Sequence, residues 1–412
     1  MGAHQEIGVG MRVLLVTDAY FPTRTSVAIL LYELAQTFLE EGKKVSIVVP
    51  SASQTEDVIF SSQEGCQIIT VKALQTKDVN YLRRTVSEFL NPWLMWRLLK
   101  KNPDFMQAVY LGVIWYSPSI FWGPLIKQLK GHFRCGSYLI LRDLFPDWAL
   151  HLGLLRNGLT YRLLKRVERY QYAQADTIGV QSPNNLLYFK KNYPQVTARL
   201  EVLWNWARPQ GSTQNMPSPI VLEETPLQGR IIFVYAGNLG VAQGIPTLLR
   251  LIEALNNHPE LGFLIVGRGS EKAKIEAFVA KRQLSNTVVC EEIDPFAIAA
   301  LFKQCHAGLL FLDHKHRTHN IPGKLVAYLQ SGLPVFAVVN PGNDLIELIP
   351  RYQIGEVDVS ENIEALKIKV LSLVRQIQQD SYIQKRARDL ANTLFNAKAK
   401  AQQILAALEG RS

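Results

Sequence analysis

The sequence contains little cysteine, and its cysteines are not arranged in pairs. Four occur in 412 residues, without a CxxC motif: Cys66, Cys135, Cys290 and Cys305. Scattered thiols are typical of proteins from reducing compartments. We therefore expect neither a disulfide framework nor a cysteine-based metal site.

The sequence also lacks a hydrophobic run suited to a secretory signal or a membrane span. Residues 1–10 show no apolar core before a small-residue cleavage site, so we expect a cytoplasmic protein. The uncharged segment 105–126 has the length of a span, which needs about 20 residues. Because Pro118 and Pro124 interrupt it, we instead expect a buried strand at 108–115, then a loop and a helix.

Signatures of nucleic-acid binding are missing, although the net charge is +10. No zinc-finger spacing, aromatic RNA-binding motif or run of five basic residues accompanies that charge, so we expect no nucleic-acid partner. Within the basic first half, residues 81–101 mix Arg and Lys with Leu, Trp and Phe. Such a segment either lies on an anionic membrane surface or forms an ordinary amphipathic helix pair, and the sequence leaves both open.

Each half of the chain begins with the same pattern of a β-branched run, a loop with Gly or Ser, and a helix. In the first half the predicted strands are 12–17 and 44–49, with a helix between them that ends at Gly42. The second half alternates helices with predicted strands at 231–236, 263–266, 287–290, 307–312 and 334–339. This alternation predicts an α/β protein with two Rossmann-like lobes, whose parallel sheets face each other across a cleft.

A polar segment marks the boundary between the halves. Residues 208–228 are rich in Pro, Ser, Thr and Gln without a sustained period, as in a linker. We predict an N-terminal domain at 1–208, a linker at 209–228 and a C-terminal domain at 229–390. A last helix at 391–412 is expected to pack back on the N-terminal lobe.

The loop after the first strand of the second half has the composition of a phosphate-binding loop. Gly237, Gly240 and Gly244 let backbone N–H groups approach a phosphate, and the following helix N-terminus favours its charge. Asn238 and Gln243 add side-chain donors. The alternative is a tight turn without ligand, but three glycines exceed what a turn needs.

Two later segments extend this predicted donor site. Gly267, Arg268 and Gly269 form a GxG turn in which Arg268 is a charged partner for the base or phosphate. Asn320, Gly323 and Lys324 lie at the start of a further helix. Because a lysine in a first helical turn opposes the helix dipole, an anion bound there is favoured over a lysine pointing to solvent.

Two further charged groups are considered. The run His314–His319 fits no standard metal-ligand spacing and reads as a polar loop. In the first half, Arg142 and Asp143 follow a buried strand, where a residue of the cleft is expected. The alternative for this pair is a structural ion pair.

In this order and across almost the whole chain, these loops resemble the retaining family 4 glycosyltransferases of the GT-B fold. The likeness is strongest to bacterial enzymes that build O-antigen, capsule or other exopolysaccharide. It rests on DAYFPTRTSVAILLYELAQTFLEEGKKVSIVVP, LRDLFPDWALHLGLL, ADTIGVQSP, VLWNWARP, YAGNLGVAQGIPTLL, FLIVGRGSEK and NIPGKLVAYLQSGLPVFA.

The resemblance implies a hexosyltransferase-type enzyme (EC 2.4) that moves a sugar, usually from a UDP-sugar, with retained configuration. It implies no cofactor and no metal, and the sequence has no Asp-x-Asp motif. The implied acceptor is a glycan or a polyprenyl-diphosphate-linked sugar, handled by a peripheral protein on the inner face of the cell membrane. Asp143, Arg142 and Lys324 would be catalytic, and Thr25, Ser26 and Asn205 would lie on the acceptor side.

Several positions depart from the family pattern. His319 and Ala327 stand where two glutamates are common, and the second of these grips the ribose. Arg142 replaces a histidine beside Asp143, and Thr25 and Ser26 replace a Gly-Gly pair. Two rival functions stay open: a nucleotide-sugar epimerase on the same architecture, and a non-catalytic partner protein with a degenerate site.

Overall fold

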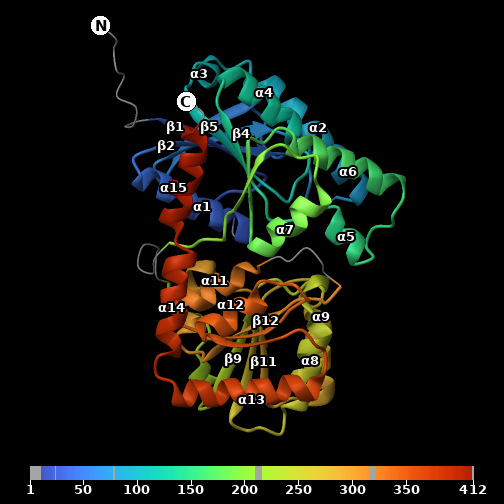
Figure 1. The fold of residues 1–412 in the computed structure, drawn as a ribbon, viewed down its shortest axis with the longest axis vertical. Coiled ribbons are helices and arrows are strands. Elements are labelled where there is room, and N and C mark those ends of the chain that lie inside the picture. The colour runs from blue at the N-terminus through green and yellow to red at the C-terminus, as the bar shows by residue number, and fades with distance from the viewer. Residues whose placement is uncertain (1–10, 24, 78, 209–215, 316–320, 411–412) are drawn as a thin grey trace. The chain divides into compact units, whose positions relative to one another are not determined.

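The computed structural model describes residues 11–23, 25–77, 79–208, 216–315 and 321–410. Two compact units are present. Unit 1 contains the chain up to Gln181, residues 185–204 and the C-terminal stretch from Ala397, whereas unit 2 contains residues 182–184 and 205–396. Each unit is a mainly parallel sheet covered by helices (Figure 1). The predicted α/β class with two Rossmann-like lobes is confirmed.

Unit 1 contains an eight-stranded sheet in the order β3-β4-β2-β1-β5-β6-β7-β8, in which only the β3–β4 pair is antiparallel. β1 and β5 lie side by side at the point where the strand order reverses, and their ladder is buried. The strands are β1 (Arg12–Val16), β2 (Lys44–Ser51), β3 (Val58–Gln63), β4 (Cys66–Lys72), β5 (Tyr110–Tyr116), β6 (Gly136–Ile140), β7 (Thr177–Val180) and β8 (Arg199–Val202).

Eight helices of the described residues belong wholly or mostly to unit 1. They are α1 (Ser26–Glu40), α2 (Tyr81–Leu99), α3 (Pro103–Met106), α4 (Gly123–Phe133), α5 (Asp147–His151), α6 (Leu159–Tyr172), α7 (Pro183–Asn192) and α15 (Ala397–Glu409). The segment 81–101, interpreted above as a possible helix pair, forms one helix with Pro92 inside it. The described residues include no helix with both the length and the hydropathy needed to cross a membrane.

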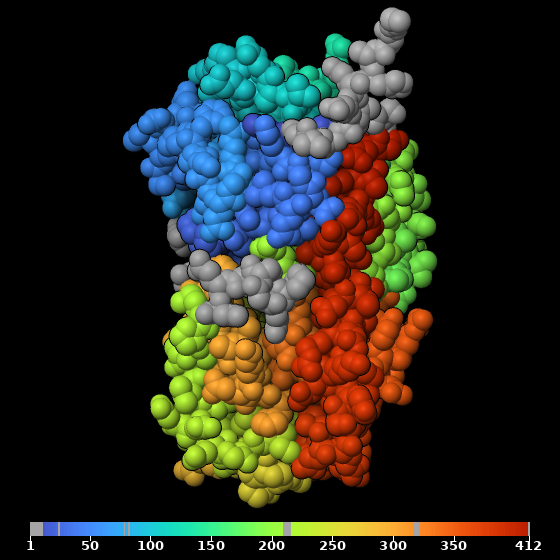
Figure 2. Space-filling view, turned by 90° about the vertical axis from the view of Figure 1, so that its left-hand side faces the viewer, coloured from blue at the N-terminus to red at the C-terminus, as the bar shows by residue number. Residues whose placement is uncertain are grey.

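The last helix of the chain, α15, completes the core of unit 1. Leu408 lies directly over Gly112 and Gly136, where a Cβ on Gly112 would come within 2.5 Å of the Leu408 side chain. Ion pairs of Lys43 with Glu409 (3.1 Å) and of Lys398 with Glu41 (3.2 Å) flank this contact. In Figure 2 the dark red residues of α15 lie beside the blue residues of the first helix.

Unit 2 contains a six-stranded, fully parallel sheet in the order β11-β10-β9-β12-β13-β14. Its strands are β9 (Ile231–Ala236), β10 (Leu261–Val266), β11 (Thr287–Cys290), β12 (Ala307–Phe311), β13 (Val335–Val338) and β14 (Gly355–Asp358). Buried continuous apolar runs such as LGFLIV in β10 are what a parallel sheet covered on both faces requires. The helices are α8 (Ile245–Ala254), α9 (Lys272–Arg282), α10 (Ile298–Phe302), α11 (Gly323–Gln330), α12 (Leu345–Tyr352), α13 (Ile363–Gln379) and α14 (Ile383–Leu394), with short 3₁₀ turns at Leu222–Glu224, Val241–Gln243 and Pro295–Ala297.

Candidate functional site

The order of strands in unit 2 reverses between β9 and β12, and ligands of open α/β sheets bind beyond the carboxyl ends of strands at such a point. The predicted loop Gly237–Gly244 leaves β9 at this edge. Tyr328 of α11 joins the two central strands, because its hydroxyl accepts from Ala236 N (3.0 Å) and donates to Leu309 O (3.3 Å). These bonds hold α11 against β9 and β12.

The glycines of the GxG turn have a packing role that the sequence did not reveal. A Cβ on Gly267 would stand 1.9 Å from Gly237 O, and one on Gly269 would stand 2.4 Å from Leu239 O. Leu239 N donates to Arg268 O (2.8 Å), which joins the same two loops. These glycines are therefore required for loop-to-loop contact, whether or not a phosphate binds.

Gly237 and Gly323 differ from the other glycines of the predicted site. A Cβ on Gly237 would meet only Lys324, at 3.7 Å, and one on Gly323 would meet nothing within 4 Å. Gly244 adopts the left-handed region (φ +56°) and lies close to Leu312 O. The open backbone for a ligand is therefore at Gly237 and Gly323.

Lys324 faces this open backbone. Its amino group stands 3.6 Å from the centre of the Tyr235 ring and donates to Gln243 Oε1 at 3.3 Å. Burial of the amino group lowers the pKa of Lys324 to about 7. Among the described residues no carboxylate pairs with it, so the group is a buried cation site without a protein anion.

The remaining predicted donor residues are placed less deeply. Asn238 is exposed, and its backbone carbonyl accepts from the Tyr235 hydroxyl (2.9 Å). Gly240 lies against the Asn238 side chain, which a Cβ there would meet at 2.9 Å. Arg268 is exposed and pairs with Glu292 at 2.9 Å, so its guanidinium is already engaged by a carboxylate. Asn320 lies outside the described residues.

In unit 1, Arg142 and Asp143 follow β6 at the carboxyl edge of that sheet. The Ser117 hydroxyl, which follows β5, accepts from Arg142 N (2.9 Å) and from Asp143 N (3.2 Å). The Arg142 side chain is only 3% exposed and donates to Leu141 O (3.2 Å), and burial lowers its pKa to about 10. Asp143 is half-buried. Of the two predicted residues, Asp143 is therefore the one more accessible to a substrate.

Sequence reasoning missed three residues at these edges. The Ser117 hydroxyl holds the backbone of Arg142 and Asp143. Asp18 follows β1, and its charge, like the charges of Arg142 and Asp143, acts on the Tyr116 hydroxyl. In unit 2, Glu361 accepts from Thr247 Oγ1 (2.9 Å). No local motif marks these residues, because each is defined by a neighbour on another strand or helix.

The predicted acceptor-side residues lie in different surroundings. Thr25 is the N-cap of α1 and accepts from Ala28 N (3.3 Å), and Ser26 is exposed in the first turn. Asn205 is 5% exposed and donates to Ile321 O (3.2 Å), three residues before Lys324. Thr25 and Ser26 thus belong to unit 1, whereas Asn205 belongs to unit 2 beside α11.

Comparison with known proteins shows a family match within the second half of the chain. Residues 222–390 match the family of glycosyl transferases group 1. The probable glycosyltransferase WbjE of Pseudomonas aeruginosa is 26% identical over 56% of this chain and 57% of its own length. The putative colanic acid biosynthesis glycosyl transferase WcaI of Escherichia coli K12 is 24% identical over 62% of this chain and 63% of its own length. The similarity therefore spans less than two thirds of these curated relatives.

A solved structure covers almost the whole chain. The structure of Alr3699/HepE from Anabaena, in complex with UDP, matches 97% of this chain and 100% of that one at 13% identity, with a TM-score of 0.66. At this identity the match shows the fold alone. Residues 222–390 are therefore similar to the group 1 glycosyl transferases, and the chain as a whole has the GT-B fold.

Proposed function

We propose that the protein transfers a sugar from a nucleotide-sugar, with a UDP-sugar as the first candidate, to a lipid-linked or glycan acceptor in surface polysaccharide synthesis. The single observation that carries this proposal is the Lys324 amino group, buried beside the open backbone of Gly237 without a carboxylate partner among the described residues. A diphosphate is the ligand that such a site fits, because it supplies the missing negative charge. HepE, which shares the fold, binds UDP.

In the proposed reaction, unit 2 stabilises the leaving group. Lys324 and the backbone amides near Gly237 would offset the charge that develops on the departing diphosphate. Donors that are already fixed in place stabilise such developing charge strongly. In unit 1, Asp143 would orient the acceptor or the sugar. The acceptor hydroxyl would attack from the face that the diphosphate leaves, and the departing phosphate would take its proton. Retention of configuration and independence of metal follow from this scheme.

The proposed membrane partner is supported by the exposed face of α2. Val86, Phe89, Leu90 and Trp93 are between 43% and 56% exposed and lie at helical spacing along one side. Exposed Arg and Lys side chains stand at both ends of this stripe. An apolar stripe between basic ends is the pattern of a helix that lies in an anionic membrane interface.

The membrane proposal predicts a selective loss of vesicle binding. Trp93→Ser should weaken binding to vesicles that contain anionic phospholipid about tenfold, because it removes a large apolar contact. Nucleotide affinity should be unchanged. Tyr382→Ser is the control, because it alters an aromatic residue in unit 2 that is even more exposed (66% against 49% for Trp93). Equal vesicle binding by the Trp93 variant and the unmodified protein would contradict the proposal.

The proposed function is tested by incubation with a panel of UDP-, GDP- and dTDP-sugars, with and without a membrane lipid extract. We expect nucleotide release and labelled lipid only where donor and extract are both present. A sugar that changes without lipid would indicate an epimerase instead. If the protein binds none of the nucleotides, the enzymatic function is contradicted and a non-catalytic partner protein is favoured.

A further inference from the structure

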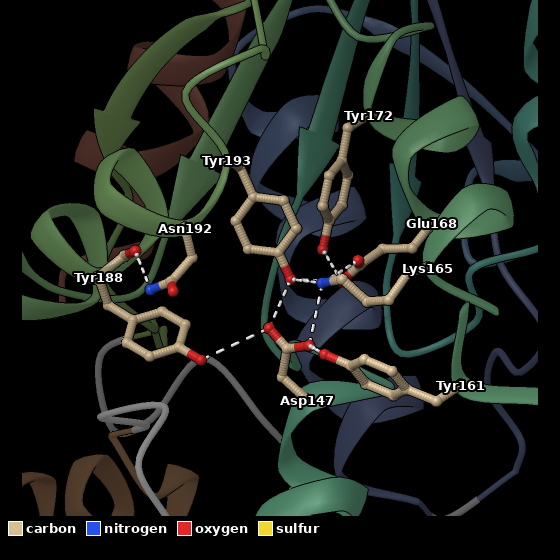
Figure 3. A network of polar contacts seen from close by, with 8 residues as sticks. All are labelled: Asp147, Tyr161, Lys165, Glu168, Tyr172, Tyr188, Asn192 and Tyr193. Atoms are coloured by element: carbon tan, nitrogen blue, oxygen red, sulfur yellow. Dashed lines mark hydrogen bonds and ion pairs between the residues drawn. The ribbon is translucent and has the colours of Figure 1, made fainter. Parts of the chain in front are cut away.

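Unit 1 contains a buried polar cluster that the proposed mechanism does not use (Figure 3). At its centre the Lys165 ammonium contacts Asp147 Oδ1 (2.9 Å), Glu168 Oε2 (2.6 Å) and the Tyr193 hydroxyl. Lys165, Asp147, Glu168 and Tyr193 are each less than 10% exposed. Burial of an ammonium and two carboxyl groups is costly unless they are paired, so the polar atoms of the cluster need close partners.

Further tyrosines complete the cluster from the surrounding elements. Tyr172 donates to Glu168 Oε1 (2.9 Å), and Tyr161 donates to Asp147 Oδ1 (2.9 Å). Tyr188 of α7 approaches Asp147 Oδ2 at 3.4 Å. The cluster therefore joins α5, α6 and the end of α7.

Asp147 connects the cluster to the predicted catalytic loop. It is the first residue of α5, and Asp143 lies four positions before it. At the other end of the loop, Ser117 accepts from the backbone of Arg142 and Asp143. The loop is thus held at one end by Ser117 and at the other by the Asp147 carboxylate.

The contacts of the Tyr193 hydroxyl indicate how many protons the cluster holds. The Tyr193 oxygen lies 2.8 Å from Asp147 Oδ2 and 2.8 Å from Glu168 Oε1, besides its contact with Lys165. A tyrosine hydroxyl has one hydrogen, so it donates to one carboxylate only. If Lys165 donates to Tyr193, the second carboxylate contact needs a proton of its own. The geometry is fully satisfied when one carboxyl is protonated.

From this arrangement we propose that the Asp147–Lys165–Glu168–Tyr193 cluster is a positioning unit, which holds the Arg142–Asp143 loop in its reactive place when Glu168 is protonated. The inference rests on the proposed function, because it assumes that Asp143 acts on the transferred sugar or its acceptor. It assigns no contact with substrate to the cluster itself.

The environment of Glu168 agrees with this assignment. Burial, and then the neighbouring Asp147 charge, raise the pKa of Glu168, whereas Lys165 opposes the shift; the resulting pKa is about 7. Tyr172 and Tyr193 are the other titratable groups that face it. Loss of the proton above that pH leaves one short oxygen contact without a hydrogen, so the loop should loosen as pH rises through neutrality.

The test compares Glu168→Gln and Tyr193→Phe with the unmodified protein at saturating donor. Glutamine keeps a donor toward Tyr193, so Glu168→Gln should match the unmodified kcat at pH 6 and lose the fall in kcat between pH 7 and 9. Phenylalanine removes the bridging hydroxyl, and Tyr193→Phe should lower kcat about 10- to 100-fold, the scale expected for a displaced reacting group. Nucleotide affinity should stay within about twofold for both, because the donor residues lie in unit 2.

Tyr110→Phe is the matched control, because Tyr110 is a buried tyrosine at the amino end of β5, opposite the carboxyl edge of the sheet. Its kcat and pH profile should be unchanged. Thermal unfolding gives a readout without activity. Because the pKa of Glu168 is raised from 4.5 to about 7 in the folded protein, the stability that its proton contributes is lost as pH rises from about 4.5 to about 7. This loss should disappear in Glu168→Gln.

Two outcomes would overturn the proposal. If the unmodified protein transfers sugar and both cluster variants keep its kcat and pH profile, the positioning role is wrong while the proposed function stands. If the unmodified protein transfers no sugar to any acceptor, the proposed function is wrong and the positioning role falls with it.

Discussion

Replacement of Lys324 by methionine should abolish sugar transfer while making unit 2 more stable. Transfer should fall by about 100-fold or more, as expected when a fixed donor to developing charge is lost. Stability should rise because the folded protein holds this amino group in a site where burial lowers its pKa from 10.5 to about 7. Each unit of such a shift corresponds to about 1.4 kcal/mol.

The sign of this stability change depends on pH. Between about pH 7 and 10.5 the unfolded chain binds a proton that the folded protein releases, so the unmodified protein gains stability as pH rises through that window. Methionine removes this dependence. The advantage of Lys324→Met should therefore be greatest at pH 7 and below, and should vanish near pH 10.5.

Thermal unfolding and transfer assays on the same variant check both effects. Lys369→Met is the matched control, because Lys369 is in unit 2 and pairs with Asp358 at 2.9 Å. It should leave transfer unchanged and give no gain in stability. An active Lys324→Met protein, or one less stable than the unmodified protein at pH 7, would show that the amino group does not have the role assigned to it.

Replacement of Gly267 by alanine should disrupt unit 2 itself. The new Cβ would stand 1.9 Å from Gly237 O, a backbone atom that cannot move aside without displacing the predicted phosphate loop. We expect a destabilisation of about 3 kcal/mol or more, at the upper end of the cost of overpacking, together with loss of nucleotide binding. Thermal unfolding and nucleotide titration measure the two effects.

Gly323→Ala supplies the contrast. Nothing in the described protein lies within 4 Å of its added Cβ, and alanine is the better helix former. The unfolding temperature should therefore be unchanged or slightly higher. Nucleotide binding should weaken, because the methyl group enters the open region beside Lys324. Normal nucleotide binding by both alanine variants would mean that the donor lies elsewhere.

The sequence predicted the sheet of unit 2 well, because its strands are buried on both faces and read as short continuous apolar runs. Two of the five predicted strands there, 231–236 and 287–290, match the structure residue for residue. The edge strand β14 (GEVD) was missed, since a half-buried segment of four residues has no apolar run. The hairpin strand β3 (VIFSSQ) was also missed, because its apolar residues are confined to its first three positions and none of its residues is fully buried.

The predicted site was less complete than the predicted fold. Glycine composition indicated the phosphate loop, but it could not separate Gly267 and Gly269, which pack loop on loop, from Gly237 and Gly323, which leave space. Arg142 was expected as a residue of the cleft, and the sequence did not reveal that its side chain is buried. Ser117 and the Asp147–Lys165–Glu168–Tyr193 cluster were missed because residues between 3 and 46 positions apart form their contacts.

The most direct test of the account is calorimetric titration of the protein with UDP at pH 8, in two buffers of different ionisation enthalpy. Because the pKa of the free Lys324 amino group is lowered to about 7, most of it is neutral at pH 8, and a bound diphosphate favours its charged form. The account predicts one binding site with uptake of nearly one proton, and no uptake for Lys324→Met. Absence of binding, or binding without proton uptake, would contradict it.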